Sequence, residues 1–306
     1  MSQLPSIFLT GGSGLLGINW FYSKRNEYTI YLGLNEKKIY PKGCKTISID
    51  FSSTELLFKQ IMIIQPSIII HTAGLTSVEI CENNPDLAYF INVELATMVA
   101  RVAKQLSIPF VHISTDHLFE GNASMLSEKE PTSAINVYGN TKALSEKAVL
   151  QINPEALLIR TNFYAWGTSY RKSFSDQIIN SLRNKQTIYL FDDVYYTPIL
   201  AENLIETVHE LLKKNASGIY NIVSDDRITK YDFGILIADQ FGLDKLYIKR
   251  SSLYSNKNLV RRPADMSLSN QKARDILGRN LGTVNNDIIR LHQQELEGNT
   301  TEIQLL

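Results

Sequence analysis

The first half of the chain alternates between short apolar runs and segments whose apolar residues lie three and four positions apart. Strands that alternate regularly with helices predict a parallel sheet with helices on both of its faces. The expected fold class is therefore α/β, a doubly wound parallel sheet. The strand-length runs are Ile7–Leu9, Tyr28–Leu34, Thr46–Ile49, Ser67–His71, Pro109–Ile113 and Ala156–Arg160.

A glycine-rich loop, TGGSGLLG at residues 10–17, follows the first predicted strand directly and opens a helix. Glycine at positions 11, 14 and 17 lets the backbone turn tightly and approach a pyrophosphate, whose charge the free amides of the helix start can meet. The loop therefore predicts a dinucleotide site. A plain tight turn is the alternative, because a glycine-rich loop alone is a weak signal.

The ends of the second and third predicted strands bear on which dinucleotide binds. An acid after the second strand takes ribose hydroxyls, whereas a basic residue accepts a phosphate. The segment LNEKK at 34–38 offers both kinds, so NADPH and NADH both stay open. Asp50 and Phe51, just past the third strand, are predicted adenine contacts. Asp50 could equally cap the helix that starts at Ser52–Thr54.

A tyrosine and a lysine four residues apart, Tyr138 and Lys142, lie at the start of a predicted helix (NVYGNTKALSEK). With fifteen tyrosines, roughly one such pair is expected by chance, so the spacing alone is weak. Its position is more informative, because it follows VHISTD, the segment that leaves the fifth predicted strand. The carboxyl ends of parallel strands share one edge, so Thr115 and Tyr138 are expected to face the glycine loop. A surface Tyr–Lys pair with a capping threonine is the alternative.

These side chains fit acid–base chemistry. A neighbouring ammonium favours a phenolate, so we expect Lys142 to lower the pKa of Tyr138. Tyr138 could then exchange a proton with a carbonyl or alcohol oxygen. Ser114 or Thr115 could hold that oxygen while a nicotinamide transfers hydride.

Five motifs together resemble the extended short-chain dehydrogenases/reductases, and among them the dTDP-4-dehydrorhamnose reductase family: TGGSGLLG, HTAGLTSVEICENNPDLAYFINV, HISTDHLFEG, NVYGNTKALSEK and RRPADMSLS. The resemblance covers nearly the whole chain and implies a Rossmann sheet with a smaller C-terminal substrate lobe. It implies Thr115, Tyr138 and Lys142 as the catalytic group and NADPH or NADH as the cofactor. Asn92 matches a helix asparagine near the family's active site, although it could equally be structural. The implied cofactor contacts are Gly11, Ser13, Gly14, Leu15, Gly17, Asp50, Phe51, Ala73, Gly74, Asn92, Tyr138 and Lys142.

The resemblance further implies reduction of a nucleotide-linked 4-keto-6-deoxy sugar in polysaccharide biosynthesis. Related 4,6-dehydratases place an acid pair after the threonine and related epimerases usually have serine there, whereas this chain has Thr115-Asp116-His117. His117 stands where the family usually has tyrosine, and Leu75 where it usually has an aromatic residue, so the sugar pocket and the substrate can differ. The expected substrate contacts are Thr76, Asp116, His117, Asn162, Trp166 and Arg262.

Beyond residue 160 the alternation loosens. The resemblance implies a dinucleotide-binding domain at 1–161, to which 197–224 returns through a helix at 200–214 and a strand at 218–223. Residues 225–306, with a contribution from 162–196, are expected to form the substrate lobe. Arg261 and Arg262 are candidate diphosphate ligands, because a guanidinium matches phosphate geometry in two bonds. A solvated arginine pair is the alternative.

Composition excludes other classes of protein. Thirty-one Lys and Arg balance thirty-one Asp and Glu, which argues against nucleic acid as a partner. Two cysteines cannot form a disulfide framework, and no secretory signal or membrane-spanning apolar run is present, so we expect a cytoplasmic protein. The five histidines lack metal-ligand spacing, so no metal is expected. A homodimer is expected by analogy with the family.

Two alternatives to a reductase stay open. The same fold serves as a non-catalytic dinucleotide-binding subunit, as in the regulatory partner of methionine adenosyltransferase. A sugar-nucleotide epimerase would use the same residues but keep its cofactor bound through a complete cycle. An intact Thr115, Tyr138 and Lys142 favours an enzyme over a regulator.

Overall fold

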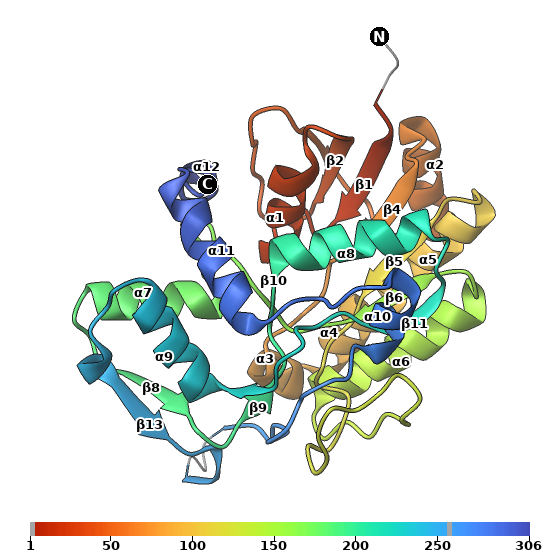
Figure 1. Ribbon diagram of the computed structural model, residues 1–306. Helices are drawn as coiled ribbons and strands as arrows, with labels where there is room; N and C mark the ends of the chain where they lie inside the picture. Colours follow the sequence, from red (N-terminus) through yellow and green to blue (C-terminus); the bar gives the residue numbers. More distant parts are fainter. Residues whose placement is uncertain (1–3, 256–258) are drawn as a thin grey trace.

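The computed structural model describes residues 4–255 and 259–306, and its main layer is a seven-stranded parallel sheet in the order β11-β6-β5-β4-β1-β2-β3 (Figure 1). The predicted α/β class is confirmed, and the predicted strands match the observed ones within a residue at most ends. Strand β11 pairs with β6, so the chain returns to this sheet after residue 217. The strands are β1 (Ser6–Thr10), β2 (Thr29–Leu34), β3 (Lys45–Ser48), β4 (Ile68–His71), β5 (Phe110–Ile113), β6 (Leu157–Arg160) and β11 (Gly218–Asn221).

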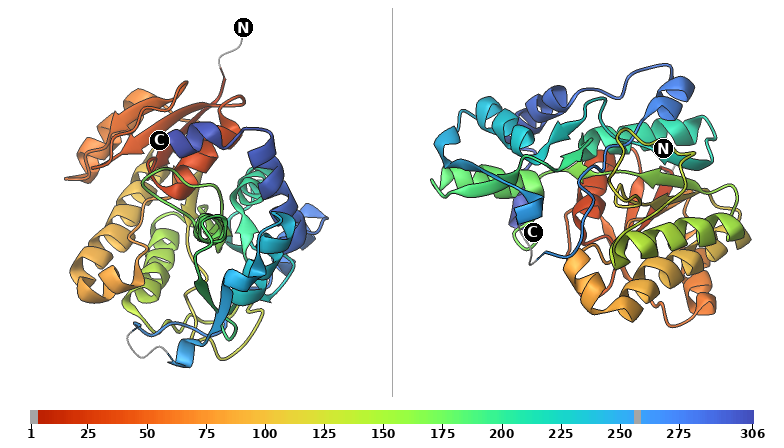
Figure 2. Two further views of the ribbon diagram at one scale, coloured as in Figure 1. Left: turned by 90° about the vertical axis from the view of Figure 1, so that its left-hand side faces the viewer. Right: turned by 90° about the horizontal axis from the view of Figure 1, so that it is seen from below.

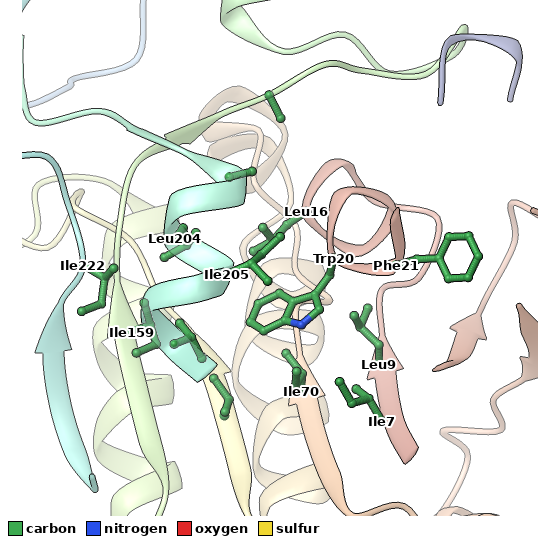
Figure 3. Packing of buried hydrophobic residues seen from close by; sticks show 14 of the residues in the cluster. Ile7, Leu9, Leu16, Trp20, Phe21, Ile70, Ile159, Leu204, Ile205 and Ile222 are labelled. Carbon is green, nitrogen blue, oxygen red and sulfur yellow. The ribbon is translucent and has the colours of Figure 1, made fainter. Parts of the chain in front are cut away.

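Helices cover both faces of the sheet because successive strand residues point to opposite sides. On one face, α1 (Leu15–Lys24), α8 (Ala201–Lys213) and α10 (Gln271–Leu277) pack on a core that includes Leu9. Figure 3 shows Trp20 of α1 and Ile205 of α8 pointing toward Ile70 of β4. On the other face, α2 (Thr54–Ile64), α5 (Leu95–Gln105) and α6 (Val137–Ile152) pack on a core that includes Phe8. Before α5 come α3 (Val78–Asn83), α4 (Pro85–Tyr89) and the π-helical turn η1 (Phe90–Glu94).

A second hydrophobic core lies beside the sheet, and Figure 2 shows its elements from two further directions. Three two-stranded sheets contribute: β10 with β7, β12 with β9, and β13 with β8. Phe233 is fully buried there against Tyr164 and Tyr196. The elements are β7 (Phe163–Tyr164), α7 (Phe174–Arg183), β8 (Ile188–Phe191), β9 (Tyr195–Tyr196), β10 (Ile199–Leu200), β12 (Ile228–Thr229), α9 (Lys230–Gln240), η2 (Lys245–Tyr247), β13 (Ile248–Ser251), η3 (Leu253–Ser255), α11 (Val284–Leu296) and α12 (Thr301–Leu305).

Membrane-spanning helices are absent from the part of the chain that the structure describes, since none there combines sufficient length with sufficient apolar character.

Two histidines lie inside the main sheet. His71 of β4 and His112 of β5 are register partners, both fully buried, with ring centroids 5.4 Å apart. His71 Nδ1 lies 2.8 Å from Thr10 Oγ1, and His112 Nε2 lies 2.9 Å from Ser145 Oγ. Burial lowers the pKa of His71 to about 3 and the pKa of His112 well below its usual value, and the nearby Lys142 charge acts in the same direction. Both imidazoles are therefore neutral in the folded protein at neutral pH.

Because of these two histidines, acid destabilises the folded protein. The unfolded chain takes up protons below a pH of about 6.5, whereas the folded chain resists them, so stability falls as pH decreases below that value. Between pH ~7.5 and pH ~5 the His71 imidazole is expected to remove about 2 kcal/mol from the free energy of unfolding, and the His112 imidazole acts in the same direction. Urea unfolding at the two pH values measures this difference. It should shrink in a His71→Gln/His112→Gln variant, and an unchanged difference would contradict the assignment.

Candidate active site

The carboxyl ends of β1 and β4 bring the glycine loop against the segment that follows β4. The Thr72 amide donates to the Thr10 carbonyl at 3.3 Å. Gly11 has a φ of +71°, and a Cβ placed there would lie 2.7 Å from the Ala73 nitrogen. Only glycine fits this position, because both the backbone conformation and the backbone of Ala73 exclude a side chain. Ala73 and Gly74 therefore lie beside the loop, as a shared cofactor site requires.

The start of α1 is open to an anion. Gly14 occupies its N-cap without a side-chain hydrogen bond, and no acidic residue lies in the first turn. Gly17 packs so closely that a Cβ there would lie 2.6 Å from the Gly11 carbonyl oxygen. The Gly14 amide donates to the Gly11 carbonyl at 2.8 Å, whereas the first-turn amides from Leu15 onwards have no side-chain cap, and the glycines leave room for a pyrophosphate to approach them. Ser13 lies in the same turn, and its carbonyl accepts a hydrogen bond from the Tyr170 hydroxyl at 2.9 Å.

The two predicted adenine contacts, Asp50 and Phe51, differ in exposure. Asp50 is exposed, and its Oδ1 accepts a hydrogen bond from the Ser52 amide at 2.8 Å. The cap of α2 is Ser53, so the alternative that Asp50 caps this helix is wrong. Phe51 packs against the core on the α2 face. The Lys37 ammonium lies 4.4 Å from the centroid of the Tyr170 ring, which places one basic group of the 34–38 segment next to the loop.

Asn92 has a structural position. It lies in the π-helical turn η1 and is 1% exposed. Its side chain accepts from the Leu75 amide at 2.8 Å and donates to the Leu75 carbonyl at 3.1 Å. It also donates to Thr141 Oγ1 of α6 at 3.0 Å. These contacts fit the alternative that Asn92 is structural, because it holds the segment after Gly74 against α6, the helix that carries Tyr138.

The start of α6 places Tyr138 beside the loop that follows β5. Asn136 caps the helix, accepting from the Gly139 amide at 2.8 Å. A Cβ on Gly139 would lie 2.2 Å from the His117 carbonyl oxygen, so glycine permits this close approach. The His117 and Tyr138 rings meet edge to face with centroids 5.5 Å apart. Thr115, Tyr138 and Lys142 are all buried next to one another at this edge of the sheet.

The expected effect of Lys142 on Tyr138 is wrong for this structure. The Lys142 ammonium donates to the Ile113 carbonyl at 2.7 Å, and burial lowers the pKa of Lys142 to about 8. Burial raises the pKa of Tyr138 well above its usual value, the Asp116 charge adds to the rise, and the Thr115 hydroxyl opposes part of it. Because desolvation dominates and the Lys142 charge is not among the causes that shift this pKa, Tyr138 keeps its proton at neutral pH.

Three of the predicted substrate residues come together after β5. Asp116 is buried, and its carboxylate accepts from the Thr115 hydroxyl at 3.2 Å and from Asn162 Nδ2 at 2.6 Å. Burial raises the pKa of Asp116 to about 6, with the Asn162 hydrogen bond opposing the rise. Burial lowers the pKa of His117 to about 3, which leaves a neutral imidazole beside Tyr138.

The other predicted substrate residues have protein partners. Trp166 is 3% exposed and packs in the second core, where its indole nitrogen donates to the Leu291 carbonyl at 2.9 Å, so its polar atom is not free for a sugar. Arg262 pairs with Glu79 of α3 whereas Arg261 is exposed, so the alternative of a solvated arginine pair is wrong for Arg262 only. Thr76 is exposed and accepts from Arg171 at 3.3 Å.

A buried ion pair that sequence reasoning missed holds α6, the helix that carries Tyr138 and Lys142. Glu146 of α6 and Arg160 at the end of β6 are 4% and 3% exposed at their side chains, with Arg160 Nη2 2.7 Å from Glu146 Oε2. The Ser114 hydroxyl donates to Glu146 Oε1 at 2.5 Å. One signal was available, because Glu146 follows Tyr138 and Lys142 on the same helix face.

No group of three or more His, Cys, Asp and Glu side chains that could hold a metal ion occurs within residues 4–255 and 259–306.

Comparison with known proteins finds one family model and relatives whose names describe reductases. The family model described as RmlD substrate binding domain matches residues 5–296. The probable low-salt glycan biosynthesis reductase Agl14 of Haloferax volcanii is 30% identical over 288 residues, which is 93% of this chain and 96% of that protein. The dTDP-4-dehydrorhamnose reductase of Escherichia coli K12 is 28% identical over 236 residues, or 73% of this chain and 78% of that enzyme.

A solved structure shows the same fold. The dTDP-4-dehydrorhamnose reductase of Bacillus anthracis, crystallised in complex with NADP, superimposes with a TM-score of 0.85 at 22% identity. The match covers 95% of this chain and all of that chain.

Gly11→Ala is expected to weaken dinucleotide binding at least ~10-fold and to lower stability by ~1–3 kcal/mol, because it adds strain at positive φ and a clash with the backbone of Ala73. Fluorescence titration with NADPH and NADH, together with thermal unfolding, measures both effects. Gly43→Ala is the matched control, since Gly43 has a φ of +88° but nothing within 4 Å of its Cβ position. Equal dinucleotide affinity in the Gly11→Ala protein and the wild type would remove the glycine loop from the cofactor site.

Proposed function

Because the chain belongs to the RmlD substrate binding domain family, we propose that it is an NAD(P)H-dependent reductase of a nucleotide-linked 4-keto-6-deoxy sugar in polysaccharide biosynthesis. The observation that carries the proposal is the protonated phenol of Tyr138, buried beside the Thr115 hydroxyl at the edge where the glycine loop lies. A ketone reduction needs a proton donor at this place. Tyr138 supplies it without a prior change of charge.

The glycine loop fits a nicotinamide dinucleotide. The amides in the first turn of α1, from Leu15 onwards, would hold its pyrophosphate, and Gly11 and Gly17 keep side chains out of the space next to them. When bound, NADPH or NADH supplies the hydride that the carbonyl carbon receives. The residues of this chain position the oxygen of the same carbonyl and donate a proton to it.

The proton follows a defined route. The Thr115 hydroxyl positions the carbonyl oxygen, and the Tyr138 hydroxyl gives its proton to that oxygen as the alcohol forms. The Tyr138 phenolate left behind lies one helical turn from Lys142. With a pKa of about 8, Lys142 is mostly a cation at neutral pH and stabilises this negative charge. The Asp116 carboxylate, with a pKa of about 6, is mostly ionised and can accept a hydrogen bond from a sugar hydroxyl.

The residues after Thr115 favour a simple reductase over a dehydratase. Removing a proton from carbon and expelling water requires a second acid–base group, and this chain has His117 after Asp116 where the related dehydratases have another acid. Burial keeps the His117 imidazole neutral, so it is a poor proton donor at neutral pH.

Tyr138→Phe is expected to lower turnover at least ~100-fold, because it removes the donated proton, while dinucleotide affinity changes no more than about twofold. The measurement follows nicotinamide absorbance as the protein meets NADH or NADPH and a freshly made dTDP-4-keto-6-deoxyhexose. Tyr189→Phe is the matched control, since Tyr189 of β8 is 69% exposed.

Full turnover by the Tyr138→Phe protein would exclude Tyr138 from the mechanism. Dinucleotide binding by the wild type without oxidation of any keto sugar would instead favour the non-catalytic regulatory subunit. A dinucleotide that stays bound through gel filtration, with no net oxidation, would favour the epimerase.

A further inference from the structure

Lys230 lies next to the loop at residues 116–121, which follows Thr115, although the two are far apart in sequence. Gly121, with a φ of +86°, approaches the turn after Arg262 so closely that a Cβ there would lie 2.7 Å from the Ala264 nitrogen. The Ala264 carbonyl accepts from the Tyr195 amide at 2.8 Å. Strand β9 pairs with β12, and Lys230 follows β12 directly. Three adjacent segments thus connect the 116–121 loop to the start of α9.

The ammonium of Lys230 is held in place but not hydrogen-bonded. It lies 4.7 Å from the centroid of the Phe174 ring and 4.9 Å from that of Tyr196. The side chain is half-buried, and the described residues provide it with neither a carboxylate within 4 Å nor a hydrogen-bond acceptor. Aromatic rings fix the position of a cation while leaving its three donors available. Because the side chain is only half-buried, a ligand oxygen can reach it from solvent.

Other polar atoms around Lys230 also lack partners. The Tyr196 hydroxyl and His117 Nδ1 are buried without a hydrogen bond. The Asp116 charge opposes the lowering of the Lys230 pKa by burial and raises the pKa of Tyr196, which places its carboxylate near both. Buried polar groups normally find partners, so unpartnered donors next to a carboxylate indicate that a polar ligand completes the site.

We propose that Lys230 and Tyr196 bind a hydroxyl group of the hexose close to its reacting carbonyl, and that they select sugars carrying this hydroxyl. A hydroxyl can accept from the ammonium and donate to Asp116, so it satisfies both sides of the site. Asp116 accepts from Thr115, the residue that would hold the carbonyl oxygen, which places the bound hydroxyl near the carbon that reacts. Lys230 is thus a substrate-positioning residue, and this role rests on the proposed function.

Lys230→Met tests the role, because it keeps an unbranched side chain over the aromatic rings but removes all three donors. Turnover with the dTDP-4-keto-6-deoxyhexose should show a 10- to 100-fold lower kcat/KM, mostly through KM, with unchanged dinucleotide affinity. Lys230→Arg should restore part of the loss. Lys272→Met is the matched control: Lys272 lies 4.0 Å from the Tyr220 ring centroid and donates to the Ile219 carbonyl at the far edge of the main sheet.

Deoxy analogues of the sugar separate recognition from folding. The wild type should lose about as much kcat/KM with the 2-deoxy or the 3-deoxy analogue as Lys230→Met loses with the full substrate. With that same analogue, Lys230→Met should lose nothing further. Equal kcat/KM in Lys230→Met and wild type would overturn the proposal. The same holds if, for both analogues, the loss caused by the substitution multiplies with the loss caused by the missing hydroxyl.

Calorimetric binding of the reduced dTDP-6-deoxyhexose distinguishes this proposal from the reductase itself, since it requires no turnover. A wild type that binds this ligand but oxidises no NADH or NADPH, with affinity lost in Lys230→Met, would refute the reductase and support the Lys230 site. Equal affinity in the two proteins would refute the Lys230 site whatever the turnover.

Discussion

The geometry of the active site depends on the buried ion pair between Glu146 and Arg160. It joins the catalytic helix α6 to the end of β6, and the Ser114 hydroxyl connects the same carboxylate to the end of β5. The Arg160 guanidinium also lies 5.6 Å from the centroid of the Phe119 ring, and Phe119 follows Asp116 in the same loop. A buried pair of this kind adds little net stability, but loss of one partner costs about 3–5 kcal/mol because a charge is left uncompensated. The pair therefore fixes Thr115 relative to Tyr138.

Exclusion of water at this edge sets the charge of each group. The same burial that keeps a proton on Tyr138 lowers the pKa of Lys142 and raises that of Asp116. A phenol and an ammonium close together in a dry site are suited to proton donation, since the ammonium interacts strongly only after the phenol has lost its proton. Lys142 thus has no need to contact Tyr138 in the resting state, where it donates to the Ile113 carbonyl.

Much of the sheet could be predicted because its strands are buried on both faces and read as uninterrupted apolar runs, as in IIIH before the Thr72 turn. The glycine loop was also predictable, since a Cβ at position 11 or 17 would clash with the backbone and the sequence therefore has Gly11 and Gly17 there. The raised pKa of Tyr138 was not, because it depends on what surrounds the side chain. Arg160 and Lys230 carry no local signal, as their partners lie in remote segments.

The sheet edge and the start of α9 hold their polar groups differently. At the sheet edge, Asn92, Lys142 and Glu146 are all bonded within the protein, which fixes their positions. The start of α9 and strand β9 instead present donors without protein partners. Leaving such donors unpaired costs stability that a bound ligand would return, so in the proposed reductase part of the binding energy would come from residues that perform no chemistry. Under the proposed function, substitutions around Lys230 would change which sugar is accepted while Tyr138 and Thr115 continued to act on the same carbonyl.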